Sequence, residues 1–133
     1  MDQIQIVEVG PRDGLQNETA PVPTEVKIAF VDALSQTGVQ EIEASAFVSP
    51  AWVPQLSDAA QVFAGIARRE GVVYSALVPN RKGLEGAMRA NVDKVSVFTS
   101  ASETFNRRNT NASIEESFGR FAEFVPEAKA AGI

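Results

Sequence analysis

A group of polar residues with catalytic potential directly follows the first apolar run of the chain. The stretch VEVGPRDGLQNE occupies positions 7–18, and its strand-like beginning is broken by a Gly-Pro pair. Arg12, Asp13 and Gln16 follow this break. A carboxylate is a suitable ligand for a hard divalent cation, and a fixed guanidinium can stabilise negative charge that develops during a reaction. These residues are therefore candidates for a functional site, although an adjacent Arg-Asp pair at a strand end is also common as a solvated turn.

The composition excludes several kinds of chemistry within these 133 residues. The absence of Cys excludes disulfides and thiolate catalysis, and the absence of His excludes imidazole bases and imidazole metal ligands. Hydrophobic residues make up 44% and charged residues 22%, which is typical of a soluble globular protein. The formal net charge of −5 argues against nonspecific binding to nucleic acid, because such binding depends on neutralising phosphates. A local basic patch could still hold a small anionic ligand.

The distribution of apolar residues predicts a protein with no membrane partner. No apolar run approaches the roughly 20 residues of a membrane-spanning helix. The first strand-like run begins at Gln3 or Ile4, which leaves no room for a signal or transit peptide before it. The sequence therefore predicts a cytoplasmic protein.

Apolar periodicity predicts four strands that alternate with four helices. The expected strands cover residues 4–9, 39–44, 72–78 and 92–99, and the expected helices cover residues 24–37, 58–68, 80–90 and a final segment after Ser113. The spacings of Asp58 with Gln61 and of Ser113 with Glu116 are typical of capping boxes.

Single residues refine the expected helix ends. Thr24 and Asn80 are the expected N-caps of the first and third helices. Pro126 should kink or interrupt the final helix, because proline lacks an N–H group and clashes with the preceding turn.

Strands that alternate with helices indicate a parallel sheet with right-handed crossovers. Two architectures remain open: a complete, small, doubly wound sheet, and a (βα)4 half of a TIM barrel. Polar residues gather after the strands, where ligands bind in both architectures. The chain has no glycine-rich phosphate loop with G-x-G-x-x-G or Walker spacing, which weakens the nucleotide-binding sheet. The half-barrel is therefore favoured, with its strands in sequential order.

A half-barrel would leave its first and last strands without a neighbour on one side. Side chains that face the barrel interior, such as Ile4 and Val97, would lose cover there. We therefore expect either self-association into a homo-oligomer or a longer polypeptide that supplies the remaining strands.

Two long motifs resemble a known family. VEVGPRDGLQNE, together with IEASAFVSPAWVPQLSD at positions 42–58, closely resembles the hydroxymethylglutaryl-CoA lyase family, within the superfamily of TIM-barrel metallolyases that carry an Arg-Asp pair. SIEESFGRF at positions 113–121 adds a third match. Related synthases share the Arg-Asp-Gly core but commonly have Thr-Leu before the Arg. Members are (βα)8 barrels of about twice this length, so the resemblance implies that residues 1–133 form a single domain, the N-terminal half-barrel of a longer catalytic domain.

The resemblance also implies a reaction and roles for four residues. Family members use a divalent metal, Mg²⁺ or Mn²⁺, to cleave 3-hydroxy-3-methylglutaryl-CoA into acetoacetate and acetyl-CoA. By resemblance, Asp13 is a metal ligand, and Arg12 is a catalytic and substrate-binding residue that stabilises enolate charge. Glu43 is a catalytic residue that orients Arg12 or the metal shell, and Gln16 contacts the substrate. Glu41 lies on the same strand face as Glu43 and is expected to be structural.

Several residues that the family uses have no counterpart in this chain. The family takes two metal ligands from a His-x-His pair and uses a Cys in a mobile loop, and this chain has neither residue type. One carboxylate is too few for a tight Mg²⁺ site, so the isolated chain is expected to be inactive and to need a missing C-terminal half-barrel. Two alternatives stay open: a noncatalytic half-barrel that acts as a scaffold or assembly chain, and a related synthase that uses acetyl-CoA.

Overall fold

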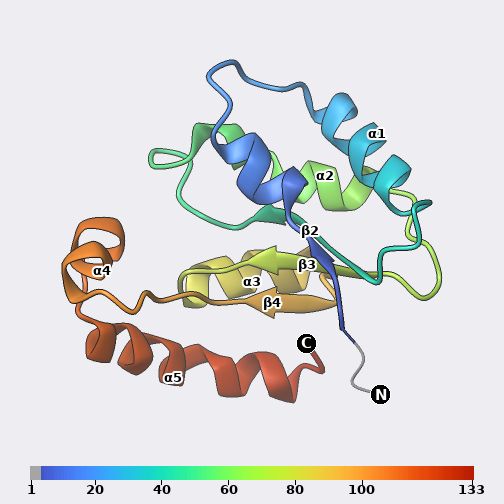
Figure 1. The fold of residues 1–133 in the computed structure, drawn as a ribbon. Helices are drawn as coiled ribbons and strands as arrows, with labels where there is room; N and C mark the ends of the chain where they lie inside the picture. The colour runs from blue at the N-terminus through green and yellow to red at the C-terminus, as the bar shows by residue number, and fades with distance from the viewer. Residues whose placement is uncertain (1–3) are drawn as a thin grey trace.

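A four-stranded parallel sheet forms the centre of the protein. The computed structural model describes residues 4–133. The strands are β1 (Val7–Glu8), β2 (Glu41–Ala46), β3 (Val73–Leu77) and β4 (Lys94–Ser96), and their order in the sheet is β1-β2-β3-β4 (Figure 1). All three neighbouring pairs are parallel. This order confirms the predicted half-barrel topology, because a doubly wound sheet would place the first strand in the middle.

The outer strands are much shorter than the sequence predicts. The runs expected at residues 4–9 and 92–99 contain only the two residues of β1 and the three residues of β4. Each of these strands has a single neighbour, and extended backbone without a second partner forms fewer ladder hydrogen bonds. β2 is also displaced by two residues from the expected range 39–44, since the chain is still turning after Gly38, whose φ of 91° requires glycine.

Within residues 4–133, five α-helices and two short helical turns connect the strands or follow the last of them. They are η1 (Gly10–Gly14, a π-helical turn), α1 (Thr24–Leu34), η2 (Pro54–Leu56, a 3₁₀ turn), α2 (Ala59–Gly65), α3 (Arg81–Arg89), α4 (Glu103–Thr110) and α5 (Ile114–Ala130). The sequence did not predict α4. Its local signal is Ser102, whose hydroxyl accepts a hydrogen bond from the N–H of Phe105 at 3.3 Å and so acts as an N-cap.

The helix caps were predicted with mixed success. Asn80 caps α3, and Ser113 with Glu116 forms a capping box at the start of α5, as predicted. Thr24 does not cap α1, which begins after Pro23. Asp58 precedes α2 but does not cap it with its side chain, because other groups bind its carboxylate.

The final helix continues through Pro126, so the predicted interruption is wrong. A proline leaves the carbonyl group four residues earlier without an intrahelical donor, which here is Ala122. Both residues are exposed, so water can satisfy this carbonyl group.

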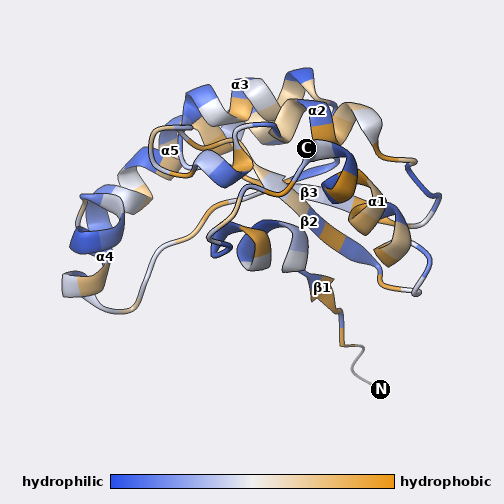
Figure 2. Ribbon diagram, turned by 90° about the horizontal axis from the view of Figure 1, so that it is seen from above, coloured by the Kyte–Doolittle hydropathy of each residue, from blue (hydrophilic) through white to orange (hydrophobic). Residues whose placement is uncertain are grey.

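The two faces of the sheet have opposite character. One face is apolar and packs against helices from the α1, α2, α3 and α5 segments of the chain, which lie on that side of the sheet (Figure 2). This core includes Val31, Ile42, Val62, Phe63, Tyr74, Ala76, Leu84, Ala87 and Phe124. On β2 the intervening positions, Glu41, Glu43 and Ser45, are polar, and Glu43 pairs in register with Ser75 of β3, which pairs with Lys94 of β4. Because side chains alternate along a strand, this polar face is the one turned away from the helical layer.

A buried ion pair joins the first two helical units. Lys27 Nζ donates a hydrogen bond to Asp58 Oδ1 at 2.7 Å and another to the backbone carbonyl of Gln55. Thr24 Oγ1 donates to the second oxygen of Asp58 at 2.6 Å. Burial alone would raise the pKa of Asp58, but the hydrogen bonds from Lys27 and Thr24 outweigh burial and hold this pKa below its ordinary value.

Replacing Asp58 with alanine is expected to lower the free energy of unfolding by about 3 kcal/mol, because the Lys27 ammonium is then buried without a counter-charge. Urea denaturation measures this loss. Arg81→Ala is the control, since it removes an exposed ion pair to Glu127 and should cost less than about 1 kcal/mol. Equal losses in the two variants would contradict the role given to the buried pair.

The same pair makes stability depend on pH in one direction. The pKa of Asp58 is lowered in the folded state, so its ionised form contributes stability above the unfolded pKa. That contribution is lost as the pH falls through the folded pKa. The stability difference between the wild type and Asp58→Asn should therefore shrink from pH 7 to pH 3, and a difference that stays constant would show that this carboxylate is not the source.

Candidate functional site

The polar group after β1 lies on a short π-helical turn with a local structural cause. The Val9 carbonyl accepts hydrogen bonds from the N–H groups of Arg12 at 3.1 Å and Asp13 at 2.7 Å. Glu8 Oε1 accepts the N–H of Gly10 at 2.7 Å, and a Cβ atom at Gly10 would lie only 2.9 Å from that oxygen. Glu8, which had no assigned role from the sequence, therefore fixes the beginning of the turn that carries Arg12 and Asp13.

Arg12 lies between two carboxylates from different elements. Its Nε donates a hydrogen bond to Oε1 of Glu43 on β2, and its Nη1 donates to Oδ1 of Asp13 at 2.9 Å. The side chain of Glu43 is 6% exposed and that of Arg12 is 18% exposed. Two charged hydrogen bonds hold the planar guanidinium in one orientation. The structure thus brings together three of the four residues that the sequence singled out.

Asp13 is the accessible member of this group. Its side chain is 57% exposed, in contrast to the buried Glu43. The two carboxylates and the single guanidinium carry a net charge of −1 when all are ionised, which favours a cation as ligand. Asp13 can therefore offer an oxygen to a metal ion while Arg12 keeps its position through Glu43.

Gln16 is not part of the hydrogen-bonded group. Within residues 4–133, no hydrogen bond joins it to Arg12, Asp13 or Glu43. Asn17, which the sequence reading missed, donates from Nδ2 to the Asp13 carbonyl at 2.8 Å and stabilises the end of the turn. The spacing of four residues between Asp13 and Asn17 was the available signal.

Glu41 takes part in a second ion pair on the polar face of the sheet. Its Oε2 accepts hydrogen bonds from Lys94 Nζ at 2.8 Å and from Gln5 Nε2 at 3.2 Å. Lys94 belongs to β4, so the pair crosses over β3. Glu41 thus has a structural partner, as the sequence suggested, but the identity of that partner could not be inferred from the sequence.

The described part of the chain supplies only a fraction of a metal site. Among residues 4–133, no three Asp or Glu side chains converge as metal ligands would. Asp13 is a suitable single ligand for Mg²⁺ or Mn²⁺, because it is an exposed carboxylate on a rigid turn. The described residues can therefore supply one carboxylate ligand to a metal ion, and the other ligands would have to come from outside residues 4–133.

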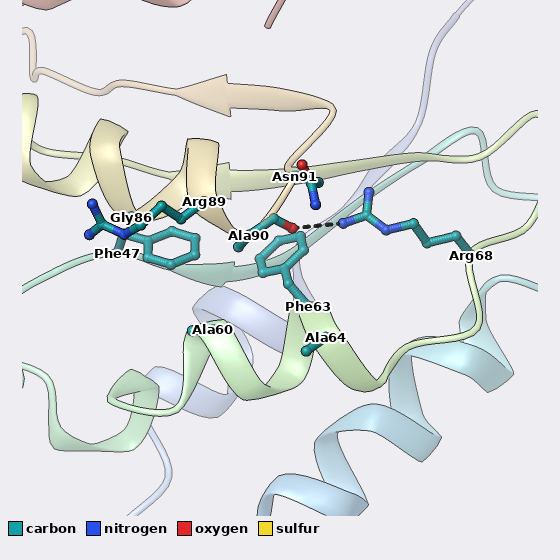
Figure 3. A pocket seen from close by; sticks show the side chains of 9 residues that line it. All are labelled: Phe47, Ala60, Phe63, Ala64, Arg68, Gly86, Arg89, Ala90 and Asn91. Carbon is teal, nitrogen blue, oxygen red and sulfur yellow. Dashed lines mark hydrogen bonds between the residues drawn. The ribbon is translucent and has the colours of Figure 1, made fainter.

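A separate cavity of about 490 Å³ lies in the outer helical layer between α2 and α3. Figure 3 shows the nine residues that line it, and none of the predicted site residues is among them. Phe47 and Phe63 stack there with ring centroids 5.9 Å apart, and the Arg68 guanidinium donates to the Ala90 carbonyl at 3.1 Å. This cavity lies on the apolar face of the sheet, so it is not the site formed by Arg12 and Glu43.

Comparisons with known proteins identify relatives of this chain. A model of the HMGL-like family matches residues 3–133. The mitochondrial hydroxymethylglutaryl-CoA lyases of Gallus gallus and Mus musculus are 53% and 55% identical over 131 residues, which is 98% of this chain but 44% and 40% of theirs. The crystal structure of the HMG-CoA lyase from Brucella melitensis is 50% identical, with a TM-score of 0.96 over 100% of this chain and 47% of that one.

The chain spans less than half the length of these relatives, and it forms half of their TIM barrel. Relatives named as mitochondrial and as cytoplasmic both occur, so the cytoplasmic location stays a prediction. Within residues 4–133, the helices are too short or too polar to cross a membrane. The family model matches residues 3–133, nearly the whole of this chain, and the half-barrel fold agrees with it, so this chain belongs to the HMGL-like family.

Proposed function

We propose that this chain forms the N-terminal half of a metal-dependent carbon–carbon lyase that cleaves 3-hydroxy-3-methylglutaryl-CoA to acetyl-CoA and acetoacetate. The observation that carries the proposal is Arg12, which follows β1 and is held between its neighbour Asp13 and Glu43 of β2. Lyases for this substrate are about half identical to the chain over nearly all of its length.

Each residue of the group has a distinct task in this proposal. Glu43 is buried and fixes the Arg12 guanidinium before substrate binds. Arg12 then stabilises the enolate oxygen of the departing acetyl-CoA fragment, an interaction that strengthens in the transition state. Asp13 is one ligand of Mg²⁺ or Mn²⁺, which when bound would polarise substrate oxygens as a Lewis acid. Gln16 is proposed to contact substrate, since it follows the same turn.

The catalytic unit requires a second half-barrel under this proposal. One carboxylate ligand cannot hold Mg²⁺ tightly, and the 133 residues contain no imidazole. We therefore expect residues 1–133 alone to have no turnover. A noncatalytic half-barrel that acts as a scaffold is the second candidate, and the lack of converging ligands among residues 4–133 is the observation that favours it. An acetyl-CoA-dependent synthase is a further alternative that shares the Arg-Asp-Gly core.

The decisive experiment is a turnover assay on the complete barrel that contains this chain. Hydroxymethylglutaryl-CoA should yield equal amounts of acetyl-CoA and acetoacetate, EDTA should abolish the reaction, and Mg²⁺ or Mn²⁺ should restore it. Consumption of acetyl-CoA with an oxo acid, instead of its release, would favour the synthase. Absence of both reactions, in a protein that binds its second half-barrel, would favour the scaffold.

We also propose that the 133-residue chain self-associates when it is isolated. Ile4, Ile6 and Val7, in or before edge strand β1, are 88%, 64% and 40% exposed, and Val97 and Phe98 after β4 are 37% and 42% exposed. Apolar side chains beside unpaired strand edges promote association. Sedimentation velocity should show dimers or larger species, and a stable monomer of 14.2 kDa would contradict this expectation.

A further inference from the structure

A connected set of polar side chains crosses the polar face of the sheet from one edge to the other. Gln5 lies just before β1, and its Nε2 donates a hydrogen bond to Oε2 of Glu41 on β2 at 3.2 Å. Lys94 of β4 donates from Nζ to the same oxygen at 2.8 Å. Because β1 and β4 are the outer strands of the sheet (Figure 1), the contacts among these three residues extend across its full width.

This polar face becomes the inside of a barrel when four more strands close it. The helices of a TIM barrel lie outside its sheet, and here the helices pack on the face opposite to Glu41 and Lys94. Barrel interiors are usually filled with branched apolar side chains. On β2, β3 and β4 the interior positions include instead Glu41, Glu43, Ser75 and Lys94. The half that closes the barrel therefore meets charged groups in place of an apolar core.

Lys94 has hydrogen-bonding capacity that residues 4–133 do not use. An ammonium group carries three donors, and within this part of the chain Nζ forms one hydrogen bond, to Glu41. The Lys94 side chain is 49% exposed, whereas that of Glu41 is 3% exposed. Water can bind the remaining donors only while this face stays open. Once further strands enclose it, an ammonium with unpaired donors would be costly, so the closing strands need to present acceptor oxygens.

The layering of barrel interiors indicates which strands supply these acceptors. Each layer in a TIM barrel takes four side chains from alternate strands. Glu41 belongs to the second strand and Lys94 to the fourth, and their contact passes over β3, as expected within one layer. The other two members of this layer then come from the sixth and eighth strands.

We propose that these two strands place side chains with acceptor oxygens against Lys94, so that the second half-barrel docks on a buried polar layer. This inference rests on the second half-barrel of the proposed function, and it adds the chemistry of the surface that this half presents. The layer includes the first residues of β2 and β4, whereas Arg12 follows the end of β1. Its role is therefore in assembly of the barrel and not in the reaction.

Chemical labelling of amines tests whether the closing half covers Lys94. The complete barrel is treated briefly with acetic anhydride, and acetylation of each lysine is measured by peptide mass spectrometry. Lys94 should react at least about tenfold more slowly than Lys82, an exposed lysine in the first turn of α3, because acylation of an enclosed amine requires local opening of the fold. Both lysines should react at similar rates in urea. Equal rates in the folded barrel would overturn the proposal.

Two variants of the complete barrel separate the acceptors of the closing half from Glu41. Glu41→Gln removes the carboxylate partner but leaves Lys94 its proposed acceptors, so Lys94 should stay protected from acetylation. Lys94→Met leaves the buried Glu41 carboxylate with Gln5 as its donor, and it leaves the acceptors of the closing half unpaired. The midpoint of urea unfolding should therefore fall further in Lys94→Met than in Glu41→Gln.

The opposite order of the two variants would contradict the proposal. Without acceptors from the closing half, Glu41→Gln would leave the Lys94 ammonium without a partner, and its urea midpoint would fall at least as far as that of Lys94→Met. If a variant does not fold, labelling of the wild type still decides the question. Neither measurement depends on turnover, so a failed lyase assay would leave this inference standing, and equal labelling in an active enzyme would overturn this inference alone.

Discussion

Replacing Arg12 with alanine in the complete enzyme is expected to lower kcat by about 10²–10³, the usual cost of removing one electrostatic donor from a developing negative charge. Metal affinity should survive, because Arg12 does not ligate and Asp13 keeps its exposed carboxylate. Turnover of hydroxymethylglutaryl-CoA and a metal titration on the same preparation measure the two effects.

Two further variants test why Arg12 is effective. Arg12→Lys keeps the charge but cannot bond Glu43 and Asp13 with a planar fork, so most of the loss should remain. Glu43→Gln keeps the shape but weakens the charged contact, and it should lower kcat less than Arg12→Ala does. If Arg12→Ala lost metal as severely as a ligand variant, the role of Arg12 as a charge-stabilising group would be wrong.

Replacing Asp13 with alanine is expected to weaken metal binding by more than about 100-fold. Loss of a residue that only hydrogen-bonds to a metal ligand already weakens metal binding by about 10–100-fold, and Asp13 is proposed to be a ligand itself. The removed group is an anionic oxygen, the preferred ligand type of Mg²⁺ and Mn²⁺. Turnover at limiting metal should fall with the affinity and recover in part at high metal concentration.

The control for this variant is Asp32→Ala, which removes the same charge from the outer helix α1. Asp32 accepts the N–H of Ala67 at 2.8 Å, far along the chain from η1, and metal affinity should be unchanged. A normal metal titration of Asp13→Ala would remove Asp13 from the ligand set. Near-normal turnover of both Arg12→Ala and Asp13→Ala would contradict the catalytic role proposed for Arg12 and the metal-binding role proposed for Asp13.

Local sequence determined the features that depend on neighbouring residues. The Ser113–Glu116 capping box formed because both partners lie within one helical turn. The alternation of strands and helices followed from apolar periodicity and implied a parallel sheet, and the lack of a glycine-rich phosphate loop favoured the sequential strand order that the sheet adopts. The motif after β1 already contained Arg12 and Asp13, and the second motif contained Glu43.

Tertiary structure decided which groups compete for each polar side chain. Asp58 stands where the sequence predicts a helix cap, but its carboxylate accepts hydrogen bonds from Lys27 and Thr24 instead. These contacts form because α1 packs against the start of α2 and because a buried ammonium needs a counter-charge. Likewise, the sequence could suggest that Glu43 orients Arg12, but only the pairing of β1 with β2 places the two side chains in contact across 31 residues. Helix caps and the alternation of strands and helices depend on residues close together in the sequence, so a short stretch of sequence predicts them. Contacts between residues far apart in the sequence depend on how the elements pack, and a short stretch of sequence does not contain that information.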